Sequence, residues 1–281
     1  MAALGYRAAK RYILPMQLPN SILITGASGG IGAALAESYA APGKYLALGG
    51  RDTERLAAVA ERCRQRGATV VATIVDVTDV EGVAAWIEET DQAGPLDLVI
   101  ANAGVQGGSL GVGRTETRDE AERVMNVNFG GVCNTVQPVI AAMRRRGRGQ
   151  IALVASLAGL RGLPYSPGYC ASKAAVKAYG EALRSWLEPE GVAISVVLPG
   201  FVETSMSKQV IGPKPLIMSP ERAARIIRRG LTRGRRQIAF PFPLYLAIQA
   251  MRLLPAVLVD RLLRRAQVEI APHERDAETS R

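Results

Sequence analysis

Short runs of β-branched and other apolar residues alternate along this chain with longer stretches in which apolar residues recur at helical spacing. That alternation is typical of repeated strand–helix–strand units whose strands lie parallel in one sheet. The expected strands are residues 21–25, 45–48, 69–75, 96–101, 150–155, 193–198 and 237–240, and the expected helices lie near residues 31–40, 52–65, 79–91, 118–146, 169–187 and 219–231. The pattern predicts an α/β fold with a doubly wound, seven-stranded parallel sheet, whose ligand should lie outside the carboxyl ends of the strands.

The length of 281 residues suits one large domain with a sizeable core. We expect residues 21–240 to form a single Rossmann-type domain, because no repeat or low-complexity linker divides them. Residues 1–20 are interpreted as an N-terminal extension, and residues 241–281 as an amphipathic helical segment with a polar tail. Neither a signal peptide nor a membrane-spanning run is expected, so the sequence favours a cytoplasmic location.

Cysteine and histidine usage excludes several kinds of site. The three cysteines, Cys63, Cys133 and Cys170, are an odd number at scattered spacing, which fits neither a disulfide framework nor a metal cluster. The one histidine, His273, lies in the polar tail. The sequence therefore predicts no metal site, no Ser-His-Asp chemistry, and a general acid other than histidine.

A glycine-rich turn follows the first expected strand and leads into a helix. Residues 25–32 read TGASGGIG, with glycines at Gly26, Gly30 and Gly32. Glycines there allow tight turning and close backbone approach, while the helix N-terminus offers unpaired N–H groups and a positive dipole. The turn therefore indicates a pyrophosphate site, although a purely structural turn would carry the same glycines.

The end of the second expected strand bears on cofactor choice. A site for NAD would carry an acidic residue in this region to bind the ribose 2′-hydroxyl, but Gly50 lies there and Arg51 follows. A guanidinium beside a missing carboxylate suits a 2′-phosphate, which it can bind through two hydrogen bonds. The sequence thus predicts NADP(H) as the preferred cofactor, with NAD(H) as the alternative. In the competing interpretation, Arg51 is a solvated loop residue and Asp52 caps the next helix.

Polar residues also follow the third and fourth expected strands. The third ends at Asp76-Val77-Thr78-Asp79, and the fourth at Asn102-Ala103-Gly104. Asp76 could accept from an adenine amino group, and the small residues after Asn102 would let the backbone approach a dinucleotide. Taken singly, each is also an ordinary turn, with Asp79 as a helix N-cap.

The strongest signal combines a serine with a tyrosine and a lysine. Ser156 directly follows the strand at 150–155, and Tyr169 comes thirteen positions later, in the run YCASK that ends at Lys173. Tyr169 and Lys173 are four residues apart and share a helix face. A free tyrosine, with a pKa of about 10, is a poor base at neutral pH, and we expect the Lys173 ammonium, with an oxidised nicotinamide nearby, to favour the phenolate. An ordinary surface pair of the same spacing is the alternative.

Together these motifs resemble the short-chain dehydrogenase/reductase family over roughly residues 20–205. They follow the family's order: TGASGGIG at 25–32, DVTD at 76–79, NAG at 102–104, MNVNFGG at 125–131, Ser156, YCASK at 169–173 and PGFVET at 199–204. Two departures are mild, because ANAG replaces the frequent NNAG and one serine stands where many members have two. The resemblance implies an NAD(P)-dependent dehydrogenase or reductase acting on CH–OH donors.

The resemblance also implies a role for each matching residue. Tyr169 would act as the acid and base, and Ser156 would stabilise the carbonyl or alkoxide. Lys173 would hold the ribose and tune Tyr169, and Asn128 would support a proton-relay water. Asn126 competes with Asn128, which we prefer because it directly precedes the run FGG. The residues implied to border the cofactor are Gly26, Ser28, Gly30, Ile31, Gly32, Arg51, Asp76, Val77, Asn102, Ala103, Gly104, Tyr169, Lys173, Pro199, Gly200, Val202 and Thr204.

The reaction that follows is hydride transfer between nicotinamide C4 and a carbonyl or secondary alcohol, with Tyr169 donating or accepting the proton. The variable residues 205–218 predict an apolar lid over a lipophilic ketone or aldehyde, which points to lipid metabolism. The apolar members of this segment are Met206, Val210, Ile211, Leu216, Ile217 and Met218. The alternative is a dinucleotide-binding sensor or scaffold protein with incidental catalysis, which would not need all four catalytic residues.

Positive charge is concentrated near the C-terminal end. The chain carries 35 Lys and Arg against 25 Asp and Glu, a net charge of +10. Residues 221–265 contain eleven arginines against Glu221 and Asp260, so they account for +9 of it. The low aromatic content of 5% disfavours a nucleic-acid partner. Since the segment is also rich in apolar residues, we expect it to contact an anionic membrane surface.

Two other partners would explain the same apolar stripe. The segment could pack on its own catalytic domain or on a partner subunit. A homo-oligomer, formed through the helices near 118–146 and 169–187, is what the resemblance implies for many family members.

Overall fold

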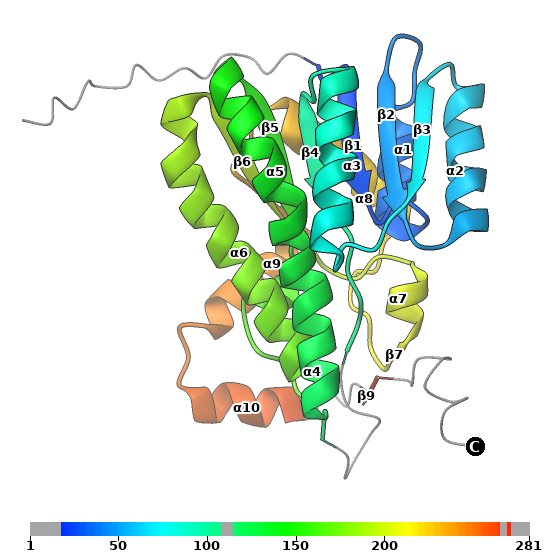
Figure 1. Cartoon of the computed structure of the whole chain (residues 1–281). Coiled ribbons are helices and arrows are strands. Elements are labelled where there is room, and N and C mark those ends of the chain that lie inside the picture. The colour runs from blue at the N-terminus through cyan, green and yellow to red at the C-terminus, as the bar shows by residue number, and fades with distance from the viewer. Residues whose placement is uncertain (1–17, 108–114, 265–268, 271–281) are drawn as a thin grey trace, which may run out of the picture.

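The computed structural model describes residues 18–107, 115–264 and 269–270. Seven parallel strands form one sheet in the order β3-β2-β1-β4-β5-β6-β8 (Figure 1). The strands are β1 (Ser21–Thr25), β2 (Tyr45–Gly50), β3 (Thr69–Ile74), β4 (Leu98–Ala101), β5 (Gly149–Val154), β6 (Val192–Pro199) and β8 (Gln237–Phe240). The predicted doubly wound, seven-stranded parallel sheet is therefore confirmed, with strand limits that differ by one or two residues.

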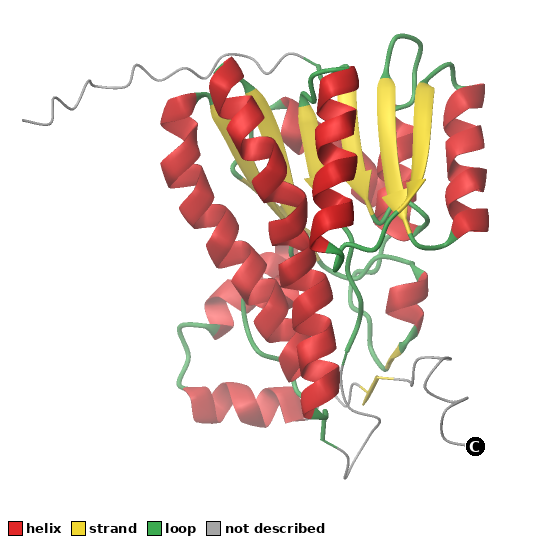
Figure 2. Ribbon diagram, in the orientation of Figure 1, coloured by secondary structure: helices red, strands yellow, loops and turns green. Residues whose placement is uncertain are grey.

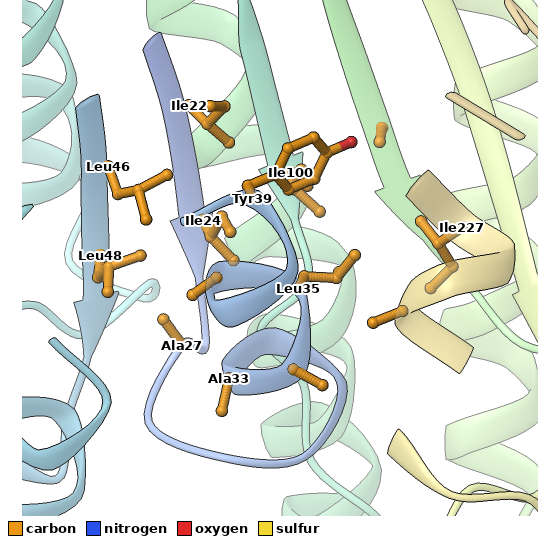
Figure 3. Close-up of a cluster of buried hydrophobic side chains, with 14 of the residues drawn as sticks. Ile22, Ile24, Ala27, Ala33, Leu35, Tyr39, Leu46, Leu48, Ile100 and Ile227 are labelled. Atoms are coloured by element: carbon orange, nitrogen blue, oxygen red, sulfur yellow. The ribbon is translucent and has the colours of Figure 1, made fainter. Parts of the chain in front are cut away.

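Helices cover both faces of this sheet, as Figure 2 shows. One face carries α1 (Gly30–Tyr39), α2 (Thr53–Gln65) and α8 (Pro220–Thr232), and the other carries α3 (Val80–Ala93), α5 (Gly131–Arg146) and α6 (Pro167–Leu187). The inner strands contribute to both cores, because successive side chains point to opposite faces, whereas the edge strand β3 contributes only Val70, to the first. Ile22 and Ile24 of β1 pack into the first cluster and Leu23 into the second. Figure 3 shows the first cluster, with Leu35 of α1 and Ile227 of α8.

Local sequence explains where two of these helices begin. Asp52 accepts a hydrogen bond from Arg55 N at 3.0 Å and caps α2, and Asp79 accepts one from Gly82 N at 3.0 Å and caps α3. A carboxylate in that position satisfies a first-turn N–H group and interacts favourably with the helix dipole. Both N-cap interpretations are confirmed.

The stretch expected as one helix at 118–146 contains a wider turn. α4 (Arg118–Met125) passes into a π-helical segment, Asn126–Gly130, before α5 begins. The extra residue of a π turn shifts the faces on which the following side chains lie. Asn128 is fully buried, whereas Asn126 is exposed. Apolar periodicity, from which the single helix was expected, does not reveal such a turn.

The position of β1 in the sheet creates a crevice. β1 lies between β2 and β4, so the loops that follow β1 and β4 leave the sheet in diverging directions. That divergence opens a space at the carboxyl ends of the two strands, which is the usual ligand position in such sheets. The glycine-rich turn follows β1, and residues 102–104 follow β4.

Residues after β6 build a second layer at this carboxyl edge. Its elements are α7 (Ser205–Lys208), β7 (Val210–Ile211), α9 (Phe242–Met251), α10 (Ala256–Arg264) and β9 (Glu269–Ile270). The lid, residues 205–218, is closed at its base by a bridge between Val202 and Met218, and β7 within it pairs antiparallel with β9. Asp260 of α10 forms an ion pair at 2.8 Å with Arg161, in the loop before α6. The C-terminal segment thus contacts both the lid and that loop.

The arginines of residues 221–265 do not form one surface. Those of α8 lie on the exposed side of a helix that packs against α1, and Arg235 and Arg236 precede β8 at the amino edge of the sheet. α9 and α10 follow β8, at the carboxyl edge, where Arg252 and Arg261 are exposed. β8 therefore separates Arg235 and Arg236, at the amino edge, from α9 and α10 at the carboxyl edge. Of the residues 221–265 that were expected to contact a membrane surface, only those of α9 and α10 are therefore retained as candidates for that contact.

None of the helices in the described part of the chain combines the length and apolarity that a bilayer crossing needs. Of the expected N-terminal extension, residues 1–17 lie outside the described residues, as does the polar tail from residue 271 onward.

Candidate active site

Three loops interlock at the carboxyl edge of the sheet. Gly26 and Gly30 of the glycine-rich turn have φ angles of +65° and +54°, in the left-handed region that glycine adopts without steric penalty. A Cβ atom on Gly26 would lie 2.8 Å from Ala103 Cα, and one on Gly30 would lie 2.9 Å from Thr204 Cγ2. The turn therefore approaches the segments 102–104 and 199–204 so closely that only glycine fits at these two positions.

Asn102 fastens its own segment to the glycine-rich turn. Its Nδ2 donates to Thr25 O at 3.0 Å and to Gly26 O at 3.2 Å. Thr25 Oγ1 in turn accepts from Asn102 N at 3.0 Å and from Ala103 N at 3.2 Å. Both amide hydrogens of Asn102 are engaged in these bonds. The residue therefore holds the crevice in shape, and the backbone of 102–104 is what remains to approach a ligand.

The start of α1 fits a pyrophosphate group. Gly29 is the N-cap residue and supplies no side-chain hydrogen bond, and a Cβ atom on it would meet nothing within 4 Å. The first-turn N–H groups, which begin at Gly30 and Ile31, consequently face open space with the positive end of the helix dipole behind them. Such a helix start binds phosphate groups readily.

A cavity of about 470 Å³ opens beyond the ends of β2 and β3, lined by Arg51 and Asp76. Arg51 Nη1 lies 3.4 Å from Asp76 Oδ2, and both side chains are exposed. Asp76 also accepts from Thr78 N at 2.9 Å and Thr78 Oγ1 at 2.8 Å. Burial raises the pKa of Asp76, but the bonds from Thr78 and the charge of Arg51 outweigh it and hold the pKa below its usual range. The Arg51 ion pair is exposed and therefore weak, so the guanidinium can turn to another anion.

Gly50 lies against Ser28 of the glycine-rich turn. A Cβ atom on Gly50 would come within 3.2 Å of Ser28 Oγ and 3.3 Å of Ser28 Cβ. A side chain at position 50 would therefore require Ser28 to shift by a few tenths of an ångström, whereas the present glycine leaves the Ser28 hydroxyl unobstructed.

Ser156 and Tyr169 meet between β5 and α6. Ser156 begins the 3₁₀ turn Leu157–Gly159 directly after β5, and its Oγ accepts from Ala158 N at 3.1 Å. The same Oγ lies 3.4 Å from Pro199 O, which it reaches as a donor, and it shares a hydrogen bond with the Tyr169 hydroxyl. The structure thus brings the predicted serine and tyrosine into direct contact.

Lys173 lies one helical turn beyond Tyr169 and is only 3% exposed. Its Nζ donates to Val154 O at 3.0 Å and lies 5.9 Å from the centroid of the Tyr169 ring. Gly104 makes room for it, because a Cβ atom there would lie 3.2 Å from Lys173 Nζ and 2.9 Å from Asn128 Oδ1. The ammonium is therefore held by the backbone of β5, beside the segment 102–104.

Burial changes the acidity of both groups. It raises the pKa of Tyr169 to about 12, against the smaller lowering effect of the bond to Ser156. It lowers the pKa of Lys173 to about 8, because an ammonium without a carboxylate partner is costly to bury. Desolvation of the phenolate is the larger effect in the protein alone, and the expected lowering of the Tyr169 pKa by Lys173 together with an oxidised nicotinamide stays a prediction. Tyr169 keeps its proton at neutral pH.

Asn128 is fully buried and uses its side chain internally. Its Oδ1 accepts from Val105 N at 2.7 Å, and its Nδ2 donates to Val105 O and to Ser172 Oγ, each at 3.0 Å. Ser172 Oγ itself donates to Tyr169 O at 2.8 Å. The amide therefore ties the loop after β4 to α6, and any water held at this residue would have to bind its main chain. Asn126, the competing candidate, is exposed and lines the cavity beside Arg51.

The segment after β6 closes the site from the other side. Gly200 N donates to Phe240 O at 2.7 Å, and Val202 is buried at the base of the lid. Thr204 caps α7 through its bond from Ser207 N at 3.1 Å. Val77 is buried against Gly131 of α5 and belongs to the apolar cluster against which Ala103 and Tyr169 pack.

Sequence reasoning missed three features of this site. Ser172, the Val154 carbonyl and the π turn around Asn128 all hold the residues that carry the predicted chemistry. Only Ser172 had a visible signal, as the serine of the run YCASK. No group of three or more His, Cys, Asp or Glu side chains that could hold a metal ion occurs among the described residues.

Known proteins share this sequence and architecture. The profile described as short chain dehydrogenase matches residues 20–214. An uncharacterized oxidoreductase of Myxococcus xanthus is 34% identical over 266 residues, which cover 94% of this chain and 99% of that protein.

Solved structures agree with the sequence comparison. A short-chain dehydrogenase from Sphingobium yanoikuyae in complex with NADPH has a TM-score of 0.71 and 27% identity, covering 84% of this chain and 96% of that one. A short chain dehydrogenase/reductase from Burkholderia phymatum in complex with NAD has a TM-score of 0.74 and 26% identity, covering 83% of this chain and 92% of that one. Dinucleotides with and without a 2′-phosphate therefore bind to proteins similar to this one.

Proposed function

The chain belongs to the short-chain dehydrogenase family of NAD(P)-dependent oxidoreductases, and from that premise we propose that it reduces a lipophilic ketone or aldehyde with NADPH. The direction of the reaction is supported by the Tyr169 hydroxyl, which bonds Ser156 and whose pKa is raised by burial to about 12, so that the protonated form is favoured. A group that holds its proton at neutral pH is poised to donate it to a carbonyl oxygen and is a poor base for an alcohol.

The residues at the site divide the work between them. When bound, the nicotinamide would supply the hydride to the carbonyl carbon. Tyr169 would donate its hydroxyl proton to the carbonyl oxygen, and Ser156, already bonded to that hydroxyl, would orient the oxygen. Lys173, held at Val154 O, would offer its remaining N–H groups to a ribose hydroxyl and supply positive charge as Tyr169 becomes a phenolate. Asn128 would hold the loop after β4 in place.

The preference for NADPH rests on Arg51, Gly50 and Ser28. Arg51 is exposed at the mouth of the cavity and only weakly paired, so its guanidinium is available to a 2′-phosphate. Gly50 leaves no carboxylate to repel that phosphate, and the contact with Ser28 leaves little room for one. The Ser28 hydroxyl is a further donor beside Gly50.

A lipophilic substrate is proposed from the side chains that border the cleft. Ile211, Leu216 and Ile217 of the lid are exposed, as is Leu163 in the loop that links Ser156 to Tyr169. Large apolar side chains left exposed in these two segments, which flank the catalytic residues in sequence, favour an apolar ligand.

We also propose that α9 and α10 contact an anionic membrane surface. Large apolar side chains of this segment point to solvent: Phe242, Leu246, Leu253, Leu254, Val257 and Leu258, with Leu253 88% exposed. Arg252 and Arg261 are exposed beside them, and Asp260 is paired with Arg161. An apolar surface flanked by cations suits the boundary between lipid headgroups and acyl chains.

Homo-oligomerisation through α5 and α6 is a further proposal. Trp186 of α6 is 60% exposed, and the Arg144 guanidinium of α5 lies 5.7 Å from its ring centroid. An exposed tryptophan and an arginine are the side chains most typical of interface centres. Light scattering on the purified chain would test for a dimer or larger assembly.

The main proposal is tested by NADPH oxidation against a panel of ketones and aldehydes of increasing chain length. We expect turnover that improves with apolar length and a loss of about a thousandfold in kcat for Tyr169→Phe. Tyr45→Phe serves as the matched control, because Tyr45 starts β2 at the opposite edge of the sheet. Undiminished turnover in Tyr169→Phe would refute the assigned proton donor, and no turnover of any carbonyl would refute the reductase.

A further inference from the structure

The helix that carries Tyr169 and Lys173 does not cap itself. α6 begins at Pro167, and its N-cap residue, Ser166, makes no side-chain hydrogen bond to the first turn. Serine is among the preferred N-cap residues, because its oxygen normally accepts from the second or third N–H group of the helix. In α6 those groups belong to Gly168 and Tyr169, so the missing cap falls on the catalytic turn.

Glu116 supplies the cap from a distant part of the chain. Its Oε2 accepts a hydrogen bond from Gly168 N at 2.7 Å, across 52 positions of sequence. Gly168 directly precedes Tyr169. A carboxylate that accepts from a first-turn N–H group also interacts favourably with the helix dipole, and such charge-assisted bonds are stronger than neutral ones.

The carboxylate of Glu116 is closely enclosed. A Cβ atom on Gly168 would lie 2.8 and 2.9 Å from its two oxygens, and one on Gly107 would lie 3.4 Å from Oε1. Oε1 is buried and has no hydrogen-bond partner among the described residues. Burying a carboxylate oxygen without a partner is unfavourable, so the enclosure is retained at a cost in stability. Gly107 lies three residues after Gly104, so this carboxylate joins the loop after β4 to the start of α6.

The backbone of Glu116 is itself fixed. The next residue, Thr117, caps α4 in a reciprocal capping box with Glu120, in which Thr117 N donates to Glu120 Oε2 at 2.9 Å. α4 packs along α6 over the turn where Gly168 lies near Ala121. A side chain anchored in this way can hold another helix at a constant position.

We propose that Glu116 is a positioning residue for catalysis, which replaces the missing cap of α6 and fixes the turn that carries Tyr169. The inference rests on the proposed role of Tyr169 as proton donor. Without the cap, the first turn of α6 would fray, and the Tyr169 hydroxyl would leave the bonded position beside Ser156. Errors of about 1 Å in such a position reduce turnover by up to about a hundredfold.

Three variants test this role. Glu116→Ala removes the acceptor, Glu116→Gln keeps an acceptor oxygen without the charge, and Glu181→Ala removes a carboxylate from α6 itself, where it pairs with Lys177 at 2.8 Å. We expect Glu116→Ala to lower kcat for carbonyl reduction by about tenfold with an unchanged KM for NADPH. Glu116→Gln should retain most of kcat, and Glu181→Ala all of it.

Hydrogen exchange supplies a readout that does not need activity. Backbone amides at the start of α6 should exchange faster in Glu116→Ala than in the parent protein, while those of its last turns should not change. Gly168→Ala, whose methyl group would push the carboxylate away, should give the same local change if Glu116→Ala proves too unstable to purify. The double variant should be no worse than either single variant, because both remove one interaction.

Several outcomes would overturn the inference. Unchanged exchange at the start of α6 in Glu116→Ala would exclude the cap, and so would equal losses of kcat in Glu116→Ala and Glu116→Gln. An unchanged kcat in Glu116→Ala, with Tyr169→Phe inactive, would refute the positioning role alone. Failure of the parent protein to reduce any carbonyl would instead refute the proposed function, while the exchange measurement would still decide whether Glu116 caps α6.

Discussion

Lys173 Nζ lies 5.9 Å from the centroid of the Tyr169 ring and is held there by a 3.0 Å hydrogen bond to Val154 O. A backbone carbonyl fixes the ammonium without neutralising it, so its charge remains directed at the tyrosine. The absence of a counter-charge is also why burial lowers the pKa of Lys173 to about 8, within reach of ordinary assay conditions. Burial therefore shifts the two pKa values in opposite directions, upward for Tyr169 and downward for Lys173.

The first prediction concerns pH. Carbonyl reduction requires a protonated Tyr169, which holds its proton up to about pH 12, and a charged Lys173, which loses its proton above about pH 8. We expect kcat/KM for reduction to be level from about pH 6 to about pH 7, to reach half of that level near pH 8 and to fall further above it, as Lys173 becomes neutral. A profile measured with NADPH and one reactive ketone checks this. A rate that rises with pH through this range would contradict it.

The second prediction concerns the cofactor. NADPH should bind more tightly than NADH, and Arg51→Ala should weaken NADPH binding by about tenfold while leaving NADH binding unchanged, because only the 2′-phosphate distinguishes the two. Fluorescence titration measures both affinities. Arg236→Ala is the matched control, since Arg236 is also exposed and paired with a carboxylate, Glu188, at 2.7 Å, but lies at the amino edge of the sheet. Tighter binding of NADH by the parent protein would defeat the Arg51 argument.

The third prediction concerns the contact between the glycine-rich turn and the segment after β6. Gly30→Ala would place a methyl group 2.9 Å from Thr204 Cγ2 at a φ of +54°, so we expect weaker NADPH binding together with a lower melting temperature. Gly43→Ala provides the control, because Gly43 has a φ of +78° and its Cβ atom would meet nothing within 4 Å. The free energy of unfolding of that variant should fall by only about 1 kcal/mol, which is the cost of placing a residue other than glycine at a positive φ. Equal NADPH affinities in the two variants would show that the Thr204 contact is unimportant.

The fourth prediction concerns the exposed apolar side chains of the C-terminal segment. The full chain should sediment with phosphatidylcholine vesicles that contain phosphatidylglycerol, and much less with phosphatidylcholine alone. Replacing both Leu253 and Val257 by aspartate should abolish this binding, because each side chain is mostly exposed and would carry charge into the lipid. Val71→Asp, at an exposed position on β3, controls for added charge. Equal binding by all three proteins, or none by the parent, would exclude membrane contact through α9 and α10.

The sheet could be predicted from sequence because strand patterns are local. Ile22, Leu23 and Ile24 are consecutive residues whose side chains alternate between the two faces of the sheet. Asp52 and Asp79 cap helices that begin at the next residue, so these features too depend only on neighbouring residues. Motif spacing likewise predicted that Ser156 and Tyr169 lie together, and in the structure the two side chains share a hydrogen bond.

Other features depend on contacts between distant segments, which no local pattern contains. The π turn that buries Asn128 is stabilised by Val105, and the cap of α6 comes from Glu116, 52 positions before Gly168. The raised pKa of Tyr169 follows from how much protein surrounds its hydroxyl. Arg236 and Arg252 belong to the same basic segment, yet β8 carries the chain between them from the amino to the carboxyl edge of the sheet. The local excess of arginine can be read from the sequence, whereas its distribution over the surface cannot.

The pairing of β7 with β9 also has a consequence for biosynthesis. Ribosomes make a chain from its amino end, and domains begin to fold as they emerge. The sheet, α6 and the lid are all complete before Asp260 and β9 have been made, although these two segments contact the loop before α6 and the lid. A released chain that ends before β9 would thus hold the dinucleotide crevice beside an unpaired β7. The contacts that enclose the substrate side therefore depend on segments made after the sheet. A product terminated near residue 255 would contain the dinucleotide crevice but would lack the contacts made by Asp260 and β9.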